Sequence, residues 1–301
     1  MTLSPTGVQY EISSGPHRAV VTEVGATLRS YAVGGRDVVH GFGEAEVIKG
    51  GRGQNLLPWP NRLRDGKYTF DGVDQQLVLS EPARHNAIHG LVRHQPWVLV
   101  EHAADSVTQR IVVYPQPGWP GVVEATITHR VAEDGLTVDV QATNRTDHDL
   151  PFGYAAHPYL SVGEETVDEV TVTVPASSYL RVDGRLLPVE VSPVEGTELD
   201  WRAGAVLGEA SLDTAYTDLA REDDGRWWVR LALGERHAAL WADEAFGWTQ
   251  VFTGGPYRNW SIAVEPMTCG PDAFNPGPTH DGLIRLAPDQ PFSARWGIVG
   301  G

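Results

Sequence analysis

The chain has 301 residues, is 41% hydrophobic and 21% charged, and carries a formal net charge of −16. This length is enough to bury a sizeable core, and the composition is that of a globular protein rather than a disordered one. A surface this acidic repels nucleic acid and anionic membranes, so neither is an expected partner.

The cysteine content and the N-terminal residues indicate where the protein works. Cys269 is the single cysteine, which excludes an intrachain disulfide framework and favours a reducing compartment. The N-terminal stretch MTLSPTGVQYEISSG lacks the basic and then apolar segments of a signal peptide. No apolar run approaches the length of a membrane span. We therefore expect a cytoplasmic protein.

The predicted elements are strands. Partial alternation or a high content of β-branched residues favours strands in these stretches: 19–33, 125–131 with 136–142 around a turn at 132–135, 167–174 and 227–233. Few windows keep a helical stripe for more than three turns, and glycine or proline recurs along the whole chain. The sequence therefore predicts an all-β fold, a large sandwich in a single domain over residues 1–301.

An early segment, residues 57–68, holds an arginine in a rigid stretch of chain. Two prolines flank Trp59, and Asn61 and Arg62 follow at once. Each proline removes a backbone donor, so an ordinary helix is excluded here. The segment predicts an extended, stiff backbone that fixes Arg62 beside a tryptophan.

A histidine-rich segment follows and raises the question of a metal site. His85 and His89 have the four-residue spacing of a zinc-binding helix. However, Pro82, Asn86 and Gly90 disfavour a helix, and no glutamate follows His85 as a metalloprotease requires. We therefore expect no metal, and for each histidine taken alone a structural role is the favoured interpretation.

Two later segments offer groups for proton transfer. His157 precedes a proline, which favours an extended backbone, and Glu265 interrupts an apolar run just before Pro266. An unpaired carboxylate among apolar neighbours has a raised pKa, which suits an acid or base, although a paired structural glutamate is an equal alternative. No nucleophile-elbow, dinucleotide or phosphate-loop motif stands in a suitable context. Proton transfer on a neutral, hydroxyl-rich substrate remains.

Taken together, these segments resemble the aldose 1-epimerase (galactose mutarotase) family over nearly the whole chain. The motifs that carry the resemblance are, in order, Gly25-Ala-Thr-Leu-Arg-Ser-Tyr, Asn61-Arg62, Asn86-Ala-Ile-His-Gly, His157-Pro-Tyr159, Leu212-Asp-Thr-Ala-Tyr, Gln250-Val-Phe-Thr-Gly and Val264-Glu265-Pro followed by Pro271-Asp-Ala-Phe-Asn275. Each motif is modest, but their order makes the combination specific. The proline after His157 and the proline before Asn61 depart from the best-known members and resemble a bacterial subgroup whose natural sugar is less certain.

The resemblance implies a fold, a site and a set of roles. The implied fold is a large antiparallel β-supersandwich, galactose mutarotase-like, with a sugar cleft on one face and no metal or organic cofactor. Glu265 is implied as the catalytic base and His157 as the acid. The implied substrate-binding residues are Arg62, Asn61, His89, Tyr159, Asp213 and Gln250. The stiff segment around Trp59 would then aim Arg62 at sugar oxygens, since a guanidinium presents five donors in a fixed fork. The alternative is that Arg62 pairs with a surface carboxylate.

The implied activity is that of an aldose 1-epimerase acting on a small-molecule sugar, as a monomer or homodimer. Opening the cyclic hemiacetal needs removal of the anomeric hydroxyl proton while the ring oxygen is protonated, and these are tasks for a carboxylate and an imidazole. One alternative is a hexose-6-phosphate or other anionic-sugar 1-epimerase. Its cationic candidates are Arg62, Arg64, Arg84, Arg93 and His94. Another alternative is a non-catalytic sugar-binding protein.

Overall fold

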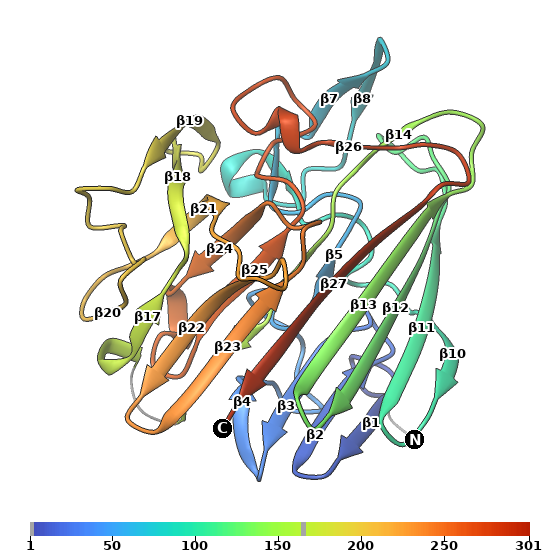
Figure 1. Ribbon diagram of the computed structural model, residues 1–301. Coiled ribbons are helices and arrows are strands. Elements are labelled where there is room, and N and C mark those ends of the chain that lie inside the picture. Colours follow the sequence, from blue (N-terminus) through green and yellow to red (C-terminus); the bar gives the residue numbers. More distant parts are fainter. Residues whose placement is uncertain (1–2, 164–166) are drawn as a thin grey trace.

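Two large antiparallel sheets dominate the computed structural model, which describes residues 3–163 and 167–301 (Figure 1). The first sheet has, in spatial order, β1 (Gln9–Ser14), β2 (His17–Thr22), β3 (Leu28–Val33), β4 (Arg36–Val39), β16 (Tyr159–Leu160), β25 (Ile262–Met267), β24 (Trp248–Phe252), β21 (Asp213–Leu219), β18 (Ala176–Val182) and β19 (Pro188–Pro193), with β15 (Ala155–Ala156) and β5 (Asn55–Leu56) attached beside β25. The second sheet has β10 (Val98–His102), β11 (Ser106–Val113), β12 (Val123–Ala132), β13 (Gly135–Asn144), β27 (Pro291–Gly300), β23 (Arg236–Ala242), β22 (Trp227–Leu233), β17 (Thr171–Thr173) and β20 (Ala205–Val206). The predicted all-β fold is confirmed.

Three short ribbons and four single turns of 3-10 helix complete the described structure. The ribbons are β6 (Arg62–Arg64) with β9 (Asn86–Ile88), β7 (Lys67–Phe70) with β8 (Val73–Gln76), and β14 (Leu150–Phe152) with β26 (Ile284–Leu286). The 3-10 turns are η1 (Pro82–Arg84), η2 (Val167–Glu169), η3 (Gly255–Tyr257) and η4 (His280–Gly282). Within the described ranges, no helix is long and apolar enough to cross a membrane. The β7–β8 hairpin projects from the top of the molecule in Figure 1.

The strands predicted from sequence are largely where the pattern places them. The pair β12 and β13 forms a hairpin closed between Ala132 and Gly135, and β22 covers the predicted stretch 227–233. The stretch 19–33 divides into β2 and β3 around a turn.

One predicted strand is partly wrong. The stretch 167–174 begins with η2, because Val167 and Val170 are both buried and the chain between them closes a turn through a 3.1 Å backbone hydrogen bond. The charged pair Asp168-Glu169 occupies that turn, and only Thr171–Thr173 is strand. The sequence prediction counts β-branched residues, and such a count does not show that the buried pair Val167 and Val170 is spaced for a turn rather than for a strand.

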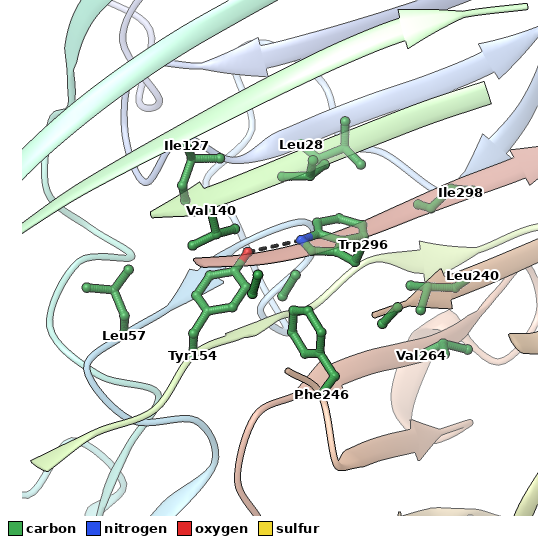
Figure 2. Packing of buried hydrophobic residues seen from close by; sticks show 14 of the residues in the cluster. Leu28, Leu57, Ile127, Val140, Tyr154, Leu240, Phe246, Val264, Trp296 and Ile298 are labelled. Atoms are coloured by element: carbon green, nitrogen blue, oxygen red, sulfur yellow. Dashed lines mark hydrogen bonds between the residues drawn. The ribbon is translucent and has the colours of Figure 1, made fainter. Parts of the chain in front are cut away.

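The main core lies between the two sheets. Along β12 and β13 buried residues alternate with more exposed ones, as expected for strands with one face on the core. Tyr154 and Trp296 lie at the centre, where the indole Nε1 donates to the phenol oxygen at 3.1 Å (Figure 2). In contrast, every residue of β25 is buried, so this strand is covered on both faces. Its second face is the floor of the candidate site.

Candidate functional site

A cavity of about 410 Å³ opens on the face of the first sheet that points away from the main core. Its volume is at the small end of the range for small-molecule pockets. All eight site residues predicted from sequence line it: Asn61, Arg62, His89, His157, Tyr159, Asp213, Gln250 and Glu265. Segments far apart in the sequence therefore meet at one place, although their predicted roles in binding and catalysis remain predictions.

Strand register explains why these side chains share one face. Val264 belongs to the core between the sheets (Figure 2), so Glu265, the next residue of β25, points to the opposite face. Gln250 of β24 lies directly across from Glu265. Tyr159 of β16 lies across from Ala263, two residues before Glu265, and hence on the same face. Three neighbouring strands thus supply the floor.

The acid and base candidates form a close pair. His157 Nε2 lies 3.2 Å from Glu265 Oε1, and both side chains are buried. Among the described residues, Glu265 Oε2 has no hydrogen-bond partner and His157 Nδ1 has none from another residue. Tyr159 stacks on the His157 ring with an interplanar angle of 13°, and its hydroxyl donates to Gly50 O at 2.8 Å. The imidazole is therefore held in place by stacking.

Burial controls the charge of this pair. Burial, and secondarily the nearby Asp213, raises the pKa of Glu265 well above its usual range, while Arg62 opposes the shift. Burial, assisted by the charge of Arg93, lowers the pKa of His157 to about 4. Both shifts favour the uncharged forms, a protonated carboxyl beside a neutral imidazole. In that state the pair holds one proton between two groups whose facing atoms lie 3.2 Å apart.

A chain of amides joins the edge of the cavity to Asp213. Gln250 Nε2 donates to Asp213 Oδ1 at 2.6 Å, and Asn61 Nδ2 donates to Gln250 Oε1 at 3.5 Å. These two contacts identify which end of the Gln250 side-chain amide is the NH₂ group and which is the oxygen. The Asn61 side-chain oxygen in turn accepts from Arg62 N, and the Asn61 backbone carbonyl accepts from His89 N. Sugar hydroxyls, which both donate and accept, could bind to such a chain.

The guanidinium of Arg62 is already bound in this structure. Its Nε and one terminal nitrogen donate to the two oxygens of Glu81 at 2.9 and 3.0 Å. Burial alone would raise the Glu81 pKa, but hydrogen bonds from Arg62, Asn86 and Arg84 lower it overall. The alternative reading, pairing with a carboxylate, is thus correct in part: Glu81 is a pocket residue rather than a surface one. That Arg62 donates to a sugar stays a prediction.

A glycine pair brings a loop against the catalytic candidates. Gly51 has a φ of +74°, and a Cβ added there would lie 2.8 Å from His157 Cδ2. At Gly50 an added Cβ would lie 2.7 Å from the Tyr257 ring. Only glycine combines this conformation with such close approach. The adjacent glycines were visible in the sequence but were not identified as part of the site.

Sequence reasoning also missed other lining residues. Those without any predicted role are Gly50, Gly51, Ser80, Glu81, Ile88 and Phe252. Of the cations named for an anionic substrate, Arg62, Arg84 and Arg93 line the cavity, whereas Arg64 and His94 do not. Arg64 instead contacts Asp272 at 3.3 Å. No group of three or more metal-ligating side chains lies close enough to hold an ion in the described parts of the chain.

Comparison with known proteins places this geometry in a family. The profile described as Aldose 1-epimerase matches residues 8–298. The chain belongs to the aldose 1-epimerase family. A full-length relative, the uncharacterized protein YihR of Escherichia coli K12, is 28% identical over 98% of this chain and 94% of its own. Human galactose mutarotase is 27% identical, with 68% of this chain and 63% of that protein aligned.

Solved structures share the fold of this aldose 1-epimerase family member. The galactose mutarotase-like protein of Clostridium acetobutylicum superposes with a TM-score of 0.87 over 97% of this chain and 94% of its own, at 14% identity. The aldose epimerase homologue of C. elegans superposes with a TM-score of 0.83 over 98% of each chain, at 20% identity. The expected galactose mutarotase-like fold is confirmed.

Proposed function

We propose that this aldose 1-epimerase family member interconverts the α and β anomers of an aldohexose by general acid and base catalysis. The observation that carries the proposal is the His157–Glu265 pair, 3.2 Å apart on the floor of the cavity. The anomeric hydroxyl and the ring oxygen are attached to the same carbon, so an acid and a base that serve both must be neighbours. The E. coli aldose 1-epimerase, 26% identical over 70% of this chain, supports the proposal.

The reaction uses the single proton of the pair. Transfer of that proton from Glu265 to His157 gives a carboxylate and an imidazolium without uptake of a proton from solvent. The carboxylate removes the proton of the anomeric hydroxyl while the imidazolium protonates the ring oxygen, and the C1–O5 bond breaks. Rotation about C1–C2 presents the other face of the aldehyde. Reverse transfers then close the other anomer and restore the pair.

The rest of the cavity supplies orientation. Gln250 and Asp213 offer a donor and an acceptor beside Glu265, and Asn61 fixes the Gln250 amide. Arg62 is held by Glu81, and its other terminal nitrogen donates to Asn61 Oδ1 at 3.3 Å. Groups preorganised in this way favour a bound ring over a mobile one.

Polarimetry with freshly dissolved α-glucose and α-galactose tests the proposal. Glu265→Gln keeps the size of the side chain but cannot accept the proton, so kcat/KM should fall by at least roughly 10²-fold. The kcat/KM of His157→Asn should fall by a similar factor. Glu124→Gln, at a partly buried carboxylate of β12 outside the cavity, is the matched control and should keep full activity. Wild-type activity in a folded Glu265→Gln protein would refute the mechanism.

A further inference from the structure

Arg93 lies in the cavity on a backbone that is fixed from two sides. Its carbonyl accepts a 3.0 Å hydrogen bond from the Gln54 amide. The preceding Val92 is fully buried, and Gln95 O accepts from Gly25 N at 2.9 Å. The loop that carries Arg93 is thus anchored to the turn between β2 and β3. Its side chain lines the cavity together with His89 and His157.

The guanidinium of Arg93 differs from the other two in the cavity. Arg62 and Arg84 both contact the carboxylate of Glu81. Arg93 is half-buried, and over residues 3–163 and 167–301 no carboxylate or other acceptor pairs with its side chain. A charge taken partly out of water without a partner is costly, so such a cation suits an anion brought by the ligand.

The charge of Arg93 acts on one side of the cavity. It lowers the pKa of His157 and of His89, in each case after the larger effect of burial. The charges that act on Glu265 are instead those of Asp213 and Arg62. Gln54 joins the two backbones directly: its side-chain amide donates to Arg93 O at 3.0 Å, and its backbone carbonyl accepts from His157 N at 3.0 Å. Arg93 therefore lies on the imidazole side, where the ring oxygen of a sugar would be protonated. In a pyranose, the carbon bonded to that oxygen on the far side from C1 is C5, which carries C6.

We propose that Arg93 binds an anionic group at C6 of the sugar, so that the preferred substrate is an aldohexose carrying a carboxylate, phosphate, sulfate or sulfonate there. The inference rests on the proposed function, because it takes the orientation of the ring from His157 acting on the ring oxygen. The neutral hydroxyls at C2 to C4 then face the amide and carboxylate groups of Gln250 and Asp213. A guanidinium suits all these anions, because its parallel donors match their paired oxygens.

The first experiment compares kcat/KM for mutarotation of glucuronate, glucose 6-phosphate and glucose 6-sulfate with that of glucose and galactose. Each rate is corrected for the spontaneous reaction. At least one anionic sugar should exceed glucose by roughly 10- to 100-fold, the value of one charge-assisted contact. Arg93→Gln should lose that advantage, so that the ratio of kcat/KM for the anionic sugar to kcat/KM for glucose falls to about 1. Arg93→Lys should recover part of it.

A control and a binding measurement separate the two proposals. Arg110→Gln, on β11 outside the cavity and paired with Glu124, should leave the preference unchanged. Calorimetry on Glu265→Gln and on the Glu265→Gln/Arg93→Gln double variant measures affinity for the same sugars without turnover. Tighter binding of an anionic sugar that disappears in the double variant supports the Arg93 subsite even where no sugar is turned over. Equal kcat/KM and affinity for neutral and anionic sugars, or a preference that survives Arg93→Gln, overturns it while leaving the mutarotase proposal standing.

Discussion

At the scale of single residues, the proposed mechanism depends on His157 and Glu265 exchanging one proton. His157 and Glu265 are both shifted toward their uncharged forms by burial. Two isolated ions would be costly here, but a proton transfer inside the pair changes no net charge. Under the proposed mechanism, we expect the polar hydroxyls of a bound sugar to stabilise the ionic form, so that binding prepares the pair for proton transfer.

The pH dependence of kcat/KM tests this description of the pair. The catalytic form holds one proton in all, and a second proton is added only as the pH falls through the lowered His157 pKa of about 4. We expect a plateau from neutral pH down to about pH 5 and a loss of activity below it, because the doubly protonated pair has no base. Initial rates by polarimetry from pH 3.5 to 8, with circular dichroism to confirm folding, give the profile. An acid limb centred near 6.5, the ordinary histidine value, would contradict it.

Gly51 provides a second test at this scale. In Gly51→Ala the new Cβ would lie 2.8 Å from His157, so the imidazole must move and kcat/KM should fall at least roughly 10-fold. The positive φ adds a backbone cost of about 1 kcal/mol. Gly72→Ala is the matched control: its φ is +78° and nothing lies within 4 Å of an added Cβ. Both variants should lose stability by thermal denaturation, Gly51→Ala by more because of its contact with His157, and only Gly51→Ala should lose activity. Equal activity in the two would show that close packing on His157 is unnecessary.

At the scale of elements, strand periodicity was predictable where one face meets the core. The alternation in β12 and β13 and the branched residues of β22 gave those strands correctly. Glu265 could be found from sequence because a carboxylate within an apolar run is conspicuous on β25. The place of Glu81 could not be predicted, and Arg93 could be named only as one of five candidate cations, because nothing local in the sequence marks which of these segments approach β25.

Residues 271–275, around Asp272, show a second limit on predicting the site from sequence. They belong to the motifs that carry the family resemblance, yet none of residues 271–275 lines the cavity that holds His157 and Glu265. Asp272 Oδ1 accepts from Arg64 N at 2.8 Å, and Asn275 Nδ2 donates to Lys67 O at 2.9 Å. This block therefore anchors β6, which begins at Arg62, and the next strand, β7. A motif can mark a support of the site as well as the site itself.

His129 gives a prediction for one strand, β12. Its ring faces the core, neither nitrogen has a hydrogen-bond partner among the described residues, and burial lowers its pKa to about 3. The unfolded chain binds the proton near pH 6.5, so wild-type stability is complete above that pH and falls as the pH drops toward 3. His129→Leu removes this loss. Relative to wild type, its free energy of unfolding should rise by up to about 1.4 kcal/mol per pH unit below 6.5, measured by urea denaturation. Parallel pH dependences for the two proteins would contradict the assignment.

At the scale of the whole molecule, the two sheets are joined by a polar contact as well as by apolar packing. The Tyr154 hydroxyl donates to Asn55 Oδ1 at 2.7 Å and accepts from Trp296 Nε1 of the second sheet at 3.1 Å (Figure 2). The Asn55 amide donates in turn to the carbonyls of Gly25 and Ala26 at 3.1 and 2.7 Å. That turn also holds the loop that carries Arg93, so the network connects the core with the wall of the cavity.

Tyr154→Phe should therefore destabilise the protein without abolishing its activity. Loss of the hydroxyl leaves a buried indole donor and a buried amide oxygen without partners, which costs about 1–3 kcal/mol. Tyr114→Phe, at a side chain that is 66% exposed, is the control and should change stability by less than about 0.5 kcal/mol. Urea denaturation measures both. Because the pair His157–Glu265 lies on the opposite face of the first sheet, kcat/KM at a temperature where Tyr154→Phe is folded should stay within about 3-fold of wild type. A catalytic loss without a loss of stability would mean that the network positions the cavity wall rather than joining the sheets.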